Sequence, residues 1–201
     1  MSKLLLVRHG DTEFNSARRF QGHSDIELST AGYRQAERLR DRLATEEIDI
    51  IYSSDLKRAL VTAELISSKH KVSLVTCPEL REINYGKLEG LIFEEISRLY
   101  PEIADRCVNW SLRLEFPSGE SFAELEDRVS KFLNRLEKHK PGQTILIVAH
   151  GGPLQLMVCY LLGIELRHWQ QIRLDNASLS IVDIYPEAAI ISLLNDTSHL
   201  K

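Results

Sequence analysis

Two short apolar stretches, each ending in a histidine followed by a glycine, constrain the fold of this chain more than any other feature. Residues 4–7 run directly into Arg8 and His9, and residues 145–149 run directly into His150. Unbroken apolar runs of this length are typical of strands buried on both faces, as in a parallel sheet. Because neighbouring parallel strands end at the same edge of a sheet, we expect the two histidines to share one site.

Further apolar segments, separated by helical patterns, predict the rest of the sheet. Strands are expected over residues 3–7, 48–52, 144–149, more weakly 72–76, and over a late pair at 177–184 and 189–194. Helices are expected to begin at Ser29 or Thr30, at Asp55, at Ser118 or Ser121, and at Pro153. The alternation predicts an α/β fold, a three-layer α/β/α sandwich with a mainly parallel central sheet.

The length of the chain fits a single domain. With 201 residues and no internal repeat or linker, residues 1–201 are expected to fold around one substantial core. The stretch of about 91–119 is less regular and contains Pro101, Trp110 and Pro117. We expect this stretch to form a small helical lid insertion over the site.

Charge and cysteine content exclude several classes of protein. The net charge of −4 gives no reason to expect nucleic-acid binding. No apolar stretch reaches the roughly 20 residues of a membrane-spanning helix, and the run before Arg8 is too short for a signal peptide. Cys77, Cys107 and Cys159 lack paired spacing and are expected to be reduced thiols. These features favour a cytoplasmic protein that binds neither nucleic acid nor membranes.

Polar side chains from four regions of the chain are predicted to meet at the carboxyl edge of the sheet. His9 and His150 each follow a strand, Arg58 follows the strand that ends near residue 52, and Glu82 follows the weak strand. Guanidinium groups stay charged and form paired hydrogen bonds with oxyanions, so Arg8 and Arg58 favour an anionic ligand.

Five stretches, in this order, closely resemble the histidine phosphatase superfamily, also called the phosphoglycerate mutase-like family. They are Leu-Val-Arg-His-Gly-Asp-Thr-Glu-Phe-Asn (6–15), Arg-Phe-Gln-Gly-His-Ser-Asp-Ile-Glu-Leu-Ser-Thr-Ala-Gly (19–32), Tyr-Ser-Ser-Asp-Leu-Lys-Arg-Ala (52–59), Leu-Arg-Glu-Ile-Asn-Tyr-Gly-Lys-Leu-Glu-Gly (80–90) and Val-Ala-His-Gly-Gly (148–152). The resemblance covers nearly the whole chain.

The resemblance implies a role for each matching residue. His9 is similar to the nucleophile that accepts the phosphoryl group as a phosphohistidine, and Glu82 to the proton donor for the leaving group. The residues similar to those that line the phosphate pocket and substrate entrance are Arg8, Asn15, Gln21, Gly22, Arg58, His150 and Gly151. The family fold and a phosphomonoesterase activity are therefore expected.

Elementary chemistry gives these residue types the same tasks. A transferring phosphoryl group spreads negative charge over its oxygens, which arginines can neutralise. His9 must be neutral to attack, with its other ring nitrogen held by an acceptor, for which a backbone carbonyl near Gly10 is the candidate. Glu82 must begin protonated, donate to the ester oxygen, and then act as base toward water.

Three features of the sequence favour hydrolysis over a mutase reaction. Family mutases carry an arginine directly after the acid, where this chain has Ile83, and a longer insert with paired arginines, which residues 91–119 lack. Residues 116–121, Phe-Pro-Ser-Gly-Glu-Ser, resemble the phosphatase branch that includes alpha-ribazole phosphatases. We therefore expect a phosphatase for a small phosphorylated metabolite, with alpha-ribazole 5'-phosphate as the leading substrate.

Two alternatives stay open beside this interpretation, a cofactor-dependent phosphoglycerate mutase and a catalytically silent phospho-ligand-binding protein. Aromatic residues of the irregular stretch are interpreted as lid packing rather than a leaving-group pocket; they are Phe93, Tyr100, Trp110 and Phe116.

No metal ion or cofactor is expected. His9, Asp11, Glu13 and His23 are potential ligands, but the neighbouring Arg8 opposes a cation and the usual ligand spacings are absent from the sequence. The expected partner is a small phosphate ester, and a homodimer remains open.

Overall fold

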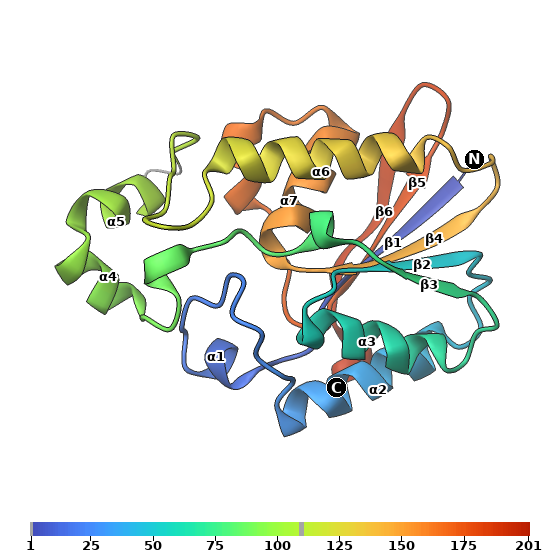
Figure 1. Ribbon diagram of the computed structural model, residues 1–201. Coiled ribbons are helices and arrows are strands. Elements are labelled where there is room, and N and C mark those ends of the chain that lie inside the picture. The colour runs from blue at the N-terminus through green and yellow to red at the C-terminus, as the bar shows by residue number, and fades with distance from the viewer. Residues whose placement is uncertain (1, 109–110) are drawn as a thin grey trace.

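The sheet carries the predicted strands in a mainly parallel arrangement. The computed structural model describes residues 2–108 and 111–201. Within this part of the chain, the strands are β1 (Ser2–Arg8), β2 (Ile50–Ser53), β3 (Ser73–Thr76), β4 (Thr144–Ala149), β5 (Leu179–Ile184) and β6 (Ala189–Asp196). They form one sheet in the order β3-β2-β4-β1-β5-β6 (Figure 1). β1 to β4 are mutually parallel, and β5 and β6 form an antiparallel edge.

Helices cover both faces of this sheet. The α-helices of the described residues are α1 (Glu13–Ser16), α2 (Thr30–Leu43), α3 (Lys57–Ser67), α4 (Phe93–Leu99), α5 (Pro101–Val108), α6 (Phe122–Leu136) and α7 (Gly151–Leu162). α2 and α3 lie on one side of the sheet and α6 and α7 on the other (Figure 1). The predicted three-layer α/β/α sandwich is confirmed.

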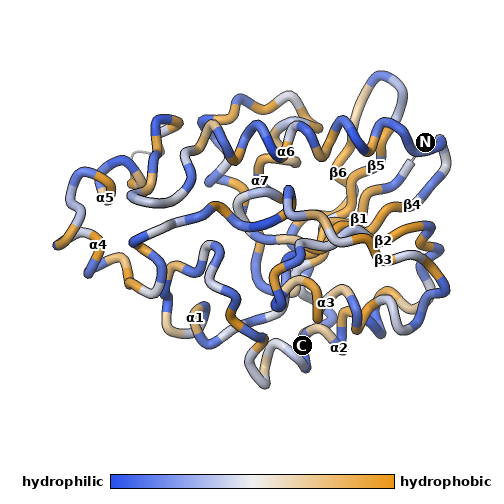
Figure 2. The backbone as a smooth tube through the Cα atoms, in the orientation of Figure 1, coloured by the Kyte–Doolittle hydropathy of each residue, from blue (hydrophilic) through white to orange (hydrophobic). Residues whose placement is uncertain are grey.

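Strand β1 shows why the layers form. Successive side chains of a strand point to opposite faces. Leu4 and Leu6 pack in the core cluster that contains α6 and α7, whereas Leu5 and Val7 pack in the cluster that contains α2 and α3. All four side chains are buried, and burial of such a side chain contributes roughly 1.5–3 kcal/mol. Figure 2 shows the same concentration of hydrophobic residues along the central strands.

Two helices begin where the sequence predicts, with one of the two candidate caps selected in each case. Ser29, not Thr30, is the N-cap of α2, and its side chain accepts a hydrogen bond from the Gly32 N–H. Ser121, not Ser118, caps α6 in a reciprocal capping box with Glu124. α7 starts at Gly151, two residues before the predicted Pro153.

The prediction that Asp55 caps α3 is wrong. Leu56 occupies the N-cap position, where no side chain accepts a hydrogen bond. The Asp55 carboxylate instead accepts two hydrogen bonds from Arg81, at 2.7 Å from Nε and 2.5 Å from Nη2. A paired, charge-assisted contact of this kind is stronger than a single backbone N–H donor.

The stretch of about 91–119 contains the short helices α4 and α5, set apart from the sheet at one end of the molecule (Figure 1). Its helical character agrees with the sequence, and its action as a lid stays a prediction. The predicted packing role of Trp110 falls outside the described residues. Among the helices that the structure describes, none has the length and apolar character to cross a bilayer.

Candidate active site

Parallel pairing of β1 with β4 places the two histidines side by side. Arg8 is the register partner of Ala149, and the His9 N–H donates to the Ala149 carbonyl at 3.0 Å. His9 and His150 are therefore the first residues beyond two neighbouring strands. Their ring centroids lie 5.0 Å apart, and both side chains are buried.

The protonation state of His9 follows from one contact. Its Nδ1 lies 2.7 Å from the Gly10 carbonyl oxygen, which can only accept, so Nδ1 carries the proton. The other ring nitrogen, Nε2, then keeps its lone pair. Burial, followed by the nearby charges of Arg58 and Arg8, holds the pKa of His9 well below its usual value. His9 is therefore a neutral imidazole with Nε2 available as a nucleophile.

Arg58 connects the second histidine to the loop after α1. Its side chain is fully buried; Nε donates to His150 Nδ1 at 3.2 Å, and Nη1 and Nη2 donate to the carbonyls of Ser24 and Gly22 at 2.8 and 2.7 Å. Burial lowers the pKa of Arg58 to about 10, so the guanidinium stays charged at neutral pH. One further N–H on each of Nη1 and Nη2 remains for a ligand.

His150 is likewise neutral. Because its Nδ1 accepts from Arg58, its Nε2 carries the proton and donates to Ser54 Oγ at 2.9 Å. Burial and the charge of Arg58 lower the pKa of His150 well below its usual value. The ring thus fixes the orientation of the arginine.

Arg8 presents a partly buried positive charge with an unused donor. Nη1 donates to the Leu174 carbonyl at 2.6 Å, while buried Nε has no partner among the described residues. Burial lowers the pKa of Arg8, and the negative charge of Glu82 opposes that shift. A buried, unpaired N–H on a charged guanidinium is a ready donor to an anion.

Glu82 lies against the first turn of α7. Its Oε1 accepts from the backbone N–H groups of Gly152 and Ile83 at 3.1 and 3.0 Å. A Cβ on Gly152 would lie 2.5 Å from Oε1, so only glycine permits this approach. The helix therefore fixes the carboxyl beside Arg8.

A polar cavity of about 220 Å³ joins most of these groups. It is lined by Arg8, His9, Asn15, Arg18, Arg19, Phe20, Gln21, Gly22, Arg58, Glu82 and Tyr85. Of the residues predicted for the site, His150 and Gly151 are not in this lining. His150 contacts the cavity residue Arg58 by a hydrogen bond and does not itself reach the cavity. Gly151 is the first residue of α7.

The side-chain amides of Asn15 and Gln21 are polar groups in the lining of the cavity. Asn15 Oδ1 accepts from the Thr12 backbone N–H at 3.1 Å and from Asn176 Nδ2 at 3.1 Å. The NH₂ group of Asn15 is thus the end that can donate to a ligand. Gln21 is buried, and its Oε1 has no partner among the described residues.

The loop that contains Gly22 is held from two sides. Gly22 has a φ of +52°, a left-handed conformation that glycine adopts without strain. Glu89 accepts from the backbone N–H groups of His23 and Ser24 at 2.8 and 2.7 Å, opposite the contacts from Arg58. The tertiary structure thereby gives Glu89 a supporting position that the sequence pattern did not assign.

Four cavity residues were not predicted as site residues, namely Arg18, Arg19, Phe20 and Tyr85. Arg19 and Phe20 open the family-like stretch 19–32, and Tyr85 lies within 80–90, so proximity to motif residues was the available signal. Spacing alone cannot show which neighbours of a motif turn inward.

An apolar cavity of about 260 Å³ adjoins the polar one. Its lining is Phe20, Ile83, Tyr85, Phe93, Cys107, Val108, Leu114, Phe116, Trp169 and Gln170. Phe20 and Tyr85 belong to both linings, with ring centroids 4.9 Å apart. The Trp169 indole N–H is buried without a partner among the described residues.

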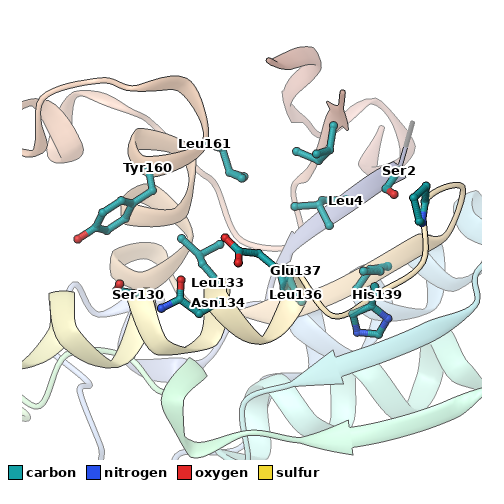
Figure 3. Close-up of a pocket in the computed structure, with 13 residues that line it drawn as sticks. Ser2, Leu4, Ser130, Leu133, Asn134, Leu136, Glu137, His139, Tyr160 and Leu161 are labelled. Carbon is teal, nitrogen blue, oxygen red and sulfur yellow. The ribbon is translucent and has the colours of Figure 1, made fainter. Parts of the chain in front are cut away.

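A larger hollow of about 450 Å³ lies at the opposite end of the sheet, where β1 and β4 begin. Figure 3 shows Leu133 and Asn134 of α6 and Tyr160 of α7 around it, with Leu4 of β1. No arginine lines this hollow, so the smaller cavity beside His9 is the candidate active site.

Within the described residues, no group of three or more histidine, cysteine or acidic side chains is arranged to hold a metal ion.

Comparison with known proteins agrees with this architecture. The sequence model of the Histidine phosphatase superfamily (branch 1) matches residues 4–197. Phosphoserine phosphatase 1 of Hydrogenobacter thermophilus is 38% identical over 200 residues, covering 100% of this chain and 95% of that protein. A probable phosphoglycerate mutase of Yersinia pestis is 36% identical over 206 residues, covering 100% of this chain and 95% of the other.

A solved structure shares the fold. The structure of a putative alpha-ribazole-5'-P phosphatase from Escherichia coli superposes with a TM-score of 0.90 at 30% identity, over 97% of this chain and 96% of that chain. The chain belongs to the histidine phosphatase superfamily, as its motifs predicted.

Proposed function

We propose that this chain hydrolyses small phosphate monoesters through a phosphohistidine at His9. The observation that carries the proposal is the His9 contact with the Gly10 carbonyl, which leaves Nε2 unprotonated beside Arg8 and Arg58. A neutral nucleophile between fixed cations suits attack on a dianionic ester.

Two steps account for the reaction. His9 Nε2 attacks phosphorus, the bond from phosphorus to the leaving oxygen breaks, and Glu82 gives that oxygen its proton. Water then attacks phosphorus, Glu82 takes a proton from the water, and the phosphorus–nitrogen bond breaks to release inorganic phosphate. Arg8, Arg58 and Asn15 donate to the phosphoryl oxygens in both steps, and His150 keeps Arg58 oriented.

The adjoining apolar cavity supports a substrate with a bulky apolar leaving group. Its walls meet the phosphate site at Phe20 and Tyr85, and burial of an aromatic ring there would add to binding. Alpha-ribazole 5'-phosphate, which carries an aromatic base, remains the leading substrate. Phe116 packs in the hydrophobic core, as expected from the sequence, and it also lines this cavity together with Phe93, where both rings can contact the leaving group.

A second candidate substrate is phosphoserine. The similarity to a phosphoserine phosphatase and the additional cations Arg18 and Arg19 in the polar cavity favour a ligand with a second anionic group. The similarity to a probable mutase keeps phosphoglycerate in the same comparison. Ile83, in place of the arginine that follows the acid in mutases, favours hydrolysis.

The test is hydrolysis of an aryl phosphate with excess chelator by the wild type and by His9→Ala. Loss of turnover in the variant, with chelator-resistant turnover and an acid-labile phosphoenzyme in the wild type, is expected. Equal activity of the two proteins would remove His9 from the mechanism. A panel of alpha-ribazole 5'-phosphate, phosphoserine and 3-phosphoglycerate, assayed for phosphate release and for isomer formation, then ranks the substrates.

A further inference from the structure

Arg128, in the middle of α6, makes an unusual set of contacts with the segment that carries Glu82. Its guanidinium donates to the carbonyl oxygens of Glu79 at 2.8 Å, Arg81 at 2.5 Å and Glu82 at 2.9 Å. One side chain from a distant helix therefore fixes three carbonyls of a segment that is outside the sheet.

Glu120 holds Arg128 in place, and we call the pair Arg128 and Glu120 the clamp on the Glu82 segment. Its carboxylate accepts from Arg128 Nε at 2.6 Å and Nη2 at 2.9 Å, and both side chains are mostly buried, with 15% and 13% exposed. Glu120 Oε2 also accepts from the Asn84 N–H at 3.2 Å, and the Glu120 N–H donates to the Asn84 carbonyl at 2.8 Å. The backbone is thus tied on both sides of Glu82, by Arg128 before it and by Glu120 after it.

We infer that Arg128, held by Glu120, is a positioning residue that sets where the Glu82 carboxyl meets the leaving group. The inference rests on the proposed function, in which Glu82 donates a proton to that oxygen. A general acid has to stand within hydrogen-bond reach of its acceptor, and a misplacement of about 1 Å can cost about 10²-fold in rate. Arg128 does not line the polar cavity, so we place its action on the reaction through Glu82.

Leaving groups of different basicity separate this role from a general loss of structure. An alkyl phosphate needs a proton on its leaving oxygen, whereas a dinitrophenyl phosphate leaves without one. In Arg128→Gln, kcat/KM for the alkyl phosphate is expected to fall by about 10²-fold, with little change for the dinitrophenyl ester. Equal losses on both esters, or no loss on either, would overturn the inference.

A double-mutant cycle links the effect to Glu82. If Arg128 acts through the carboxyl, Arg128→Gln combined with Glu82→Gln should be no slower on the alkyl phosphate than Glu82→Gln alone. Additive losses would contradict the inference. Glu120→Gln, which keeps the arginine, is the milder second variant and should show the same dependence on leaving group.

Arg135 provides the matched control on the same helix. It forms an ion pair with Glu79 at 2.5 Å and donates to Cys77 Sγ at 3.1 Å. Arg135→Gln removes a comparable contact to this segment and should give no leaving-group dependence. Retained activity in His9→Ala would refute the proposed function itself, an outcome distinct from equal losses in Arg128→Gln.

Discussion

At the scale of single residues, the site is defined by fixed protons and fixed charges. The Gly10 carbonyl selects the tautomer of His9, and the Arg58 contact selects the opposite tautomer of His150. Both selections come from hydrogen bonds with only one chemically allowed direction. The two histidines therefore differ in which ring nitrogen carries the proton, although each follows a strand and precedes a glycine.

The acid limb of the pH profile should report the charge around His9. Burial, followed by the charges of Arg58 and Arg8, lowers the pKa of His9, so kcat/KM should persist below pH 6.5. Arg8→Gln removes one of these charges and should move the acid limb to higher pH. The ionisation of the substrate is common to both enzymes and cancels in the comparison. Lys57→Gln, which removes an exposed cation paired with Glu27, is the control. Coincident acid limbs for wild type and Arg8→Gln would contradict the prediction.

Glu82→Gln should remove the proton donor while it keeps the size and shape of the side chain. The amide oxygen can still accept from Gly152, so we expect a fold-neutral variant whose kcat on an alkyl phosphate falls about 10²–10⁴-fold. Glu79→Gln is the matched control, since that carboxylate pairs with Arg135 and does not line the cavity. Equal rates for the two variants in steady-state assays would assign the acid elsewhere.

At the scale of elements, the start of α6 links stability to the site. Ser121 Oγ accepts from the Glu124 N–H, and the Glu124 carboxylate accepts from the Ser121 N–H. The helix then carries Arg128 to the Glu82 segment. Loss of the Ser121 cap should therefore lower the stability of the fold, and it should affect catalysis only through the position of Arg128.

Ser121→Ala should reduce the free energy of unfolding by about 1 kcal/mol, the typical cost of a lost serine cap. Ser118→Ala, in the candidate cap position that the helix does not use, should have a much smaller effect. Urea denaturation followed by circular dichroism measures both variants. Similar destabilisation by the two substitutions would argue against the observed cap.

At the scale of the whole molecule, the buried neutral histidines make stability depend on pH. His9 and His150 keep pKa values well below 6.5 when folded, but the unfolded chain binds their protons near pH 6.5. Between the folded and unfolded pKa values the unfolded state holds more protons, so stability rises with pH and is lost as pH falls below 6.5. Each histidine contributes up to about 1.4 kcal/mol per pH unit in this window.

The melting temperature should therefore fall as pH is lowered from 7 toward 5. The window lies above that of Asp55 and Asp196, whose folded pKa values are lowered, because their contribution is lost only below about pH 4. Calorimetry across this range, with buffers of matched ionic strength, measures the slope. A melting temperature that stays constant between pH 7 and 5 would show that the histidines do not remain neutral.

The sequence by itself determined the sheet, its two His-Gly strand ends and the nucleophile candidate. Apolar periodicity and serine caps are local signals, which neighbours in the chain are sufficient to express. The need for an acceptor on His9 came from the chemistry of a neutral imidazole, and the folded structure supplies that acceptor as the Gly10 carbonyl.

Only the tertiary structure decided contacts between residues far apart in the chain. Asp55 pairs with Arg81 instead of capping α3, Arg128 meets the Glu82 carbonyl 46 positions away, and Phe20 turns into the same cavity as Tyr85. In each case several partners were chemically suitable, and packing of the layers brought one of them within hydrogen-bond or van der Waals distance. A pattern of residue types gives the chemistry available to a chain, whereas the choice among distant partners is made by the geometry of the folded layers.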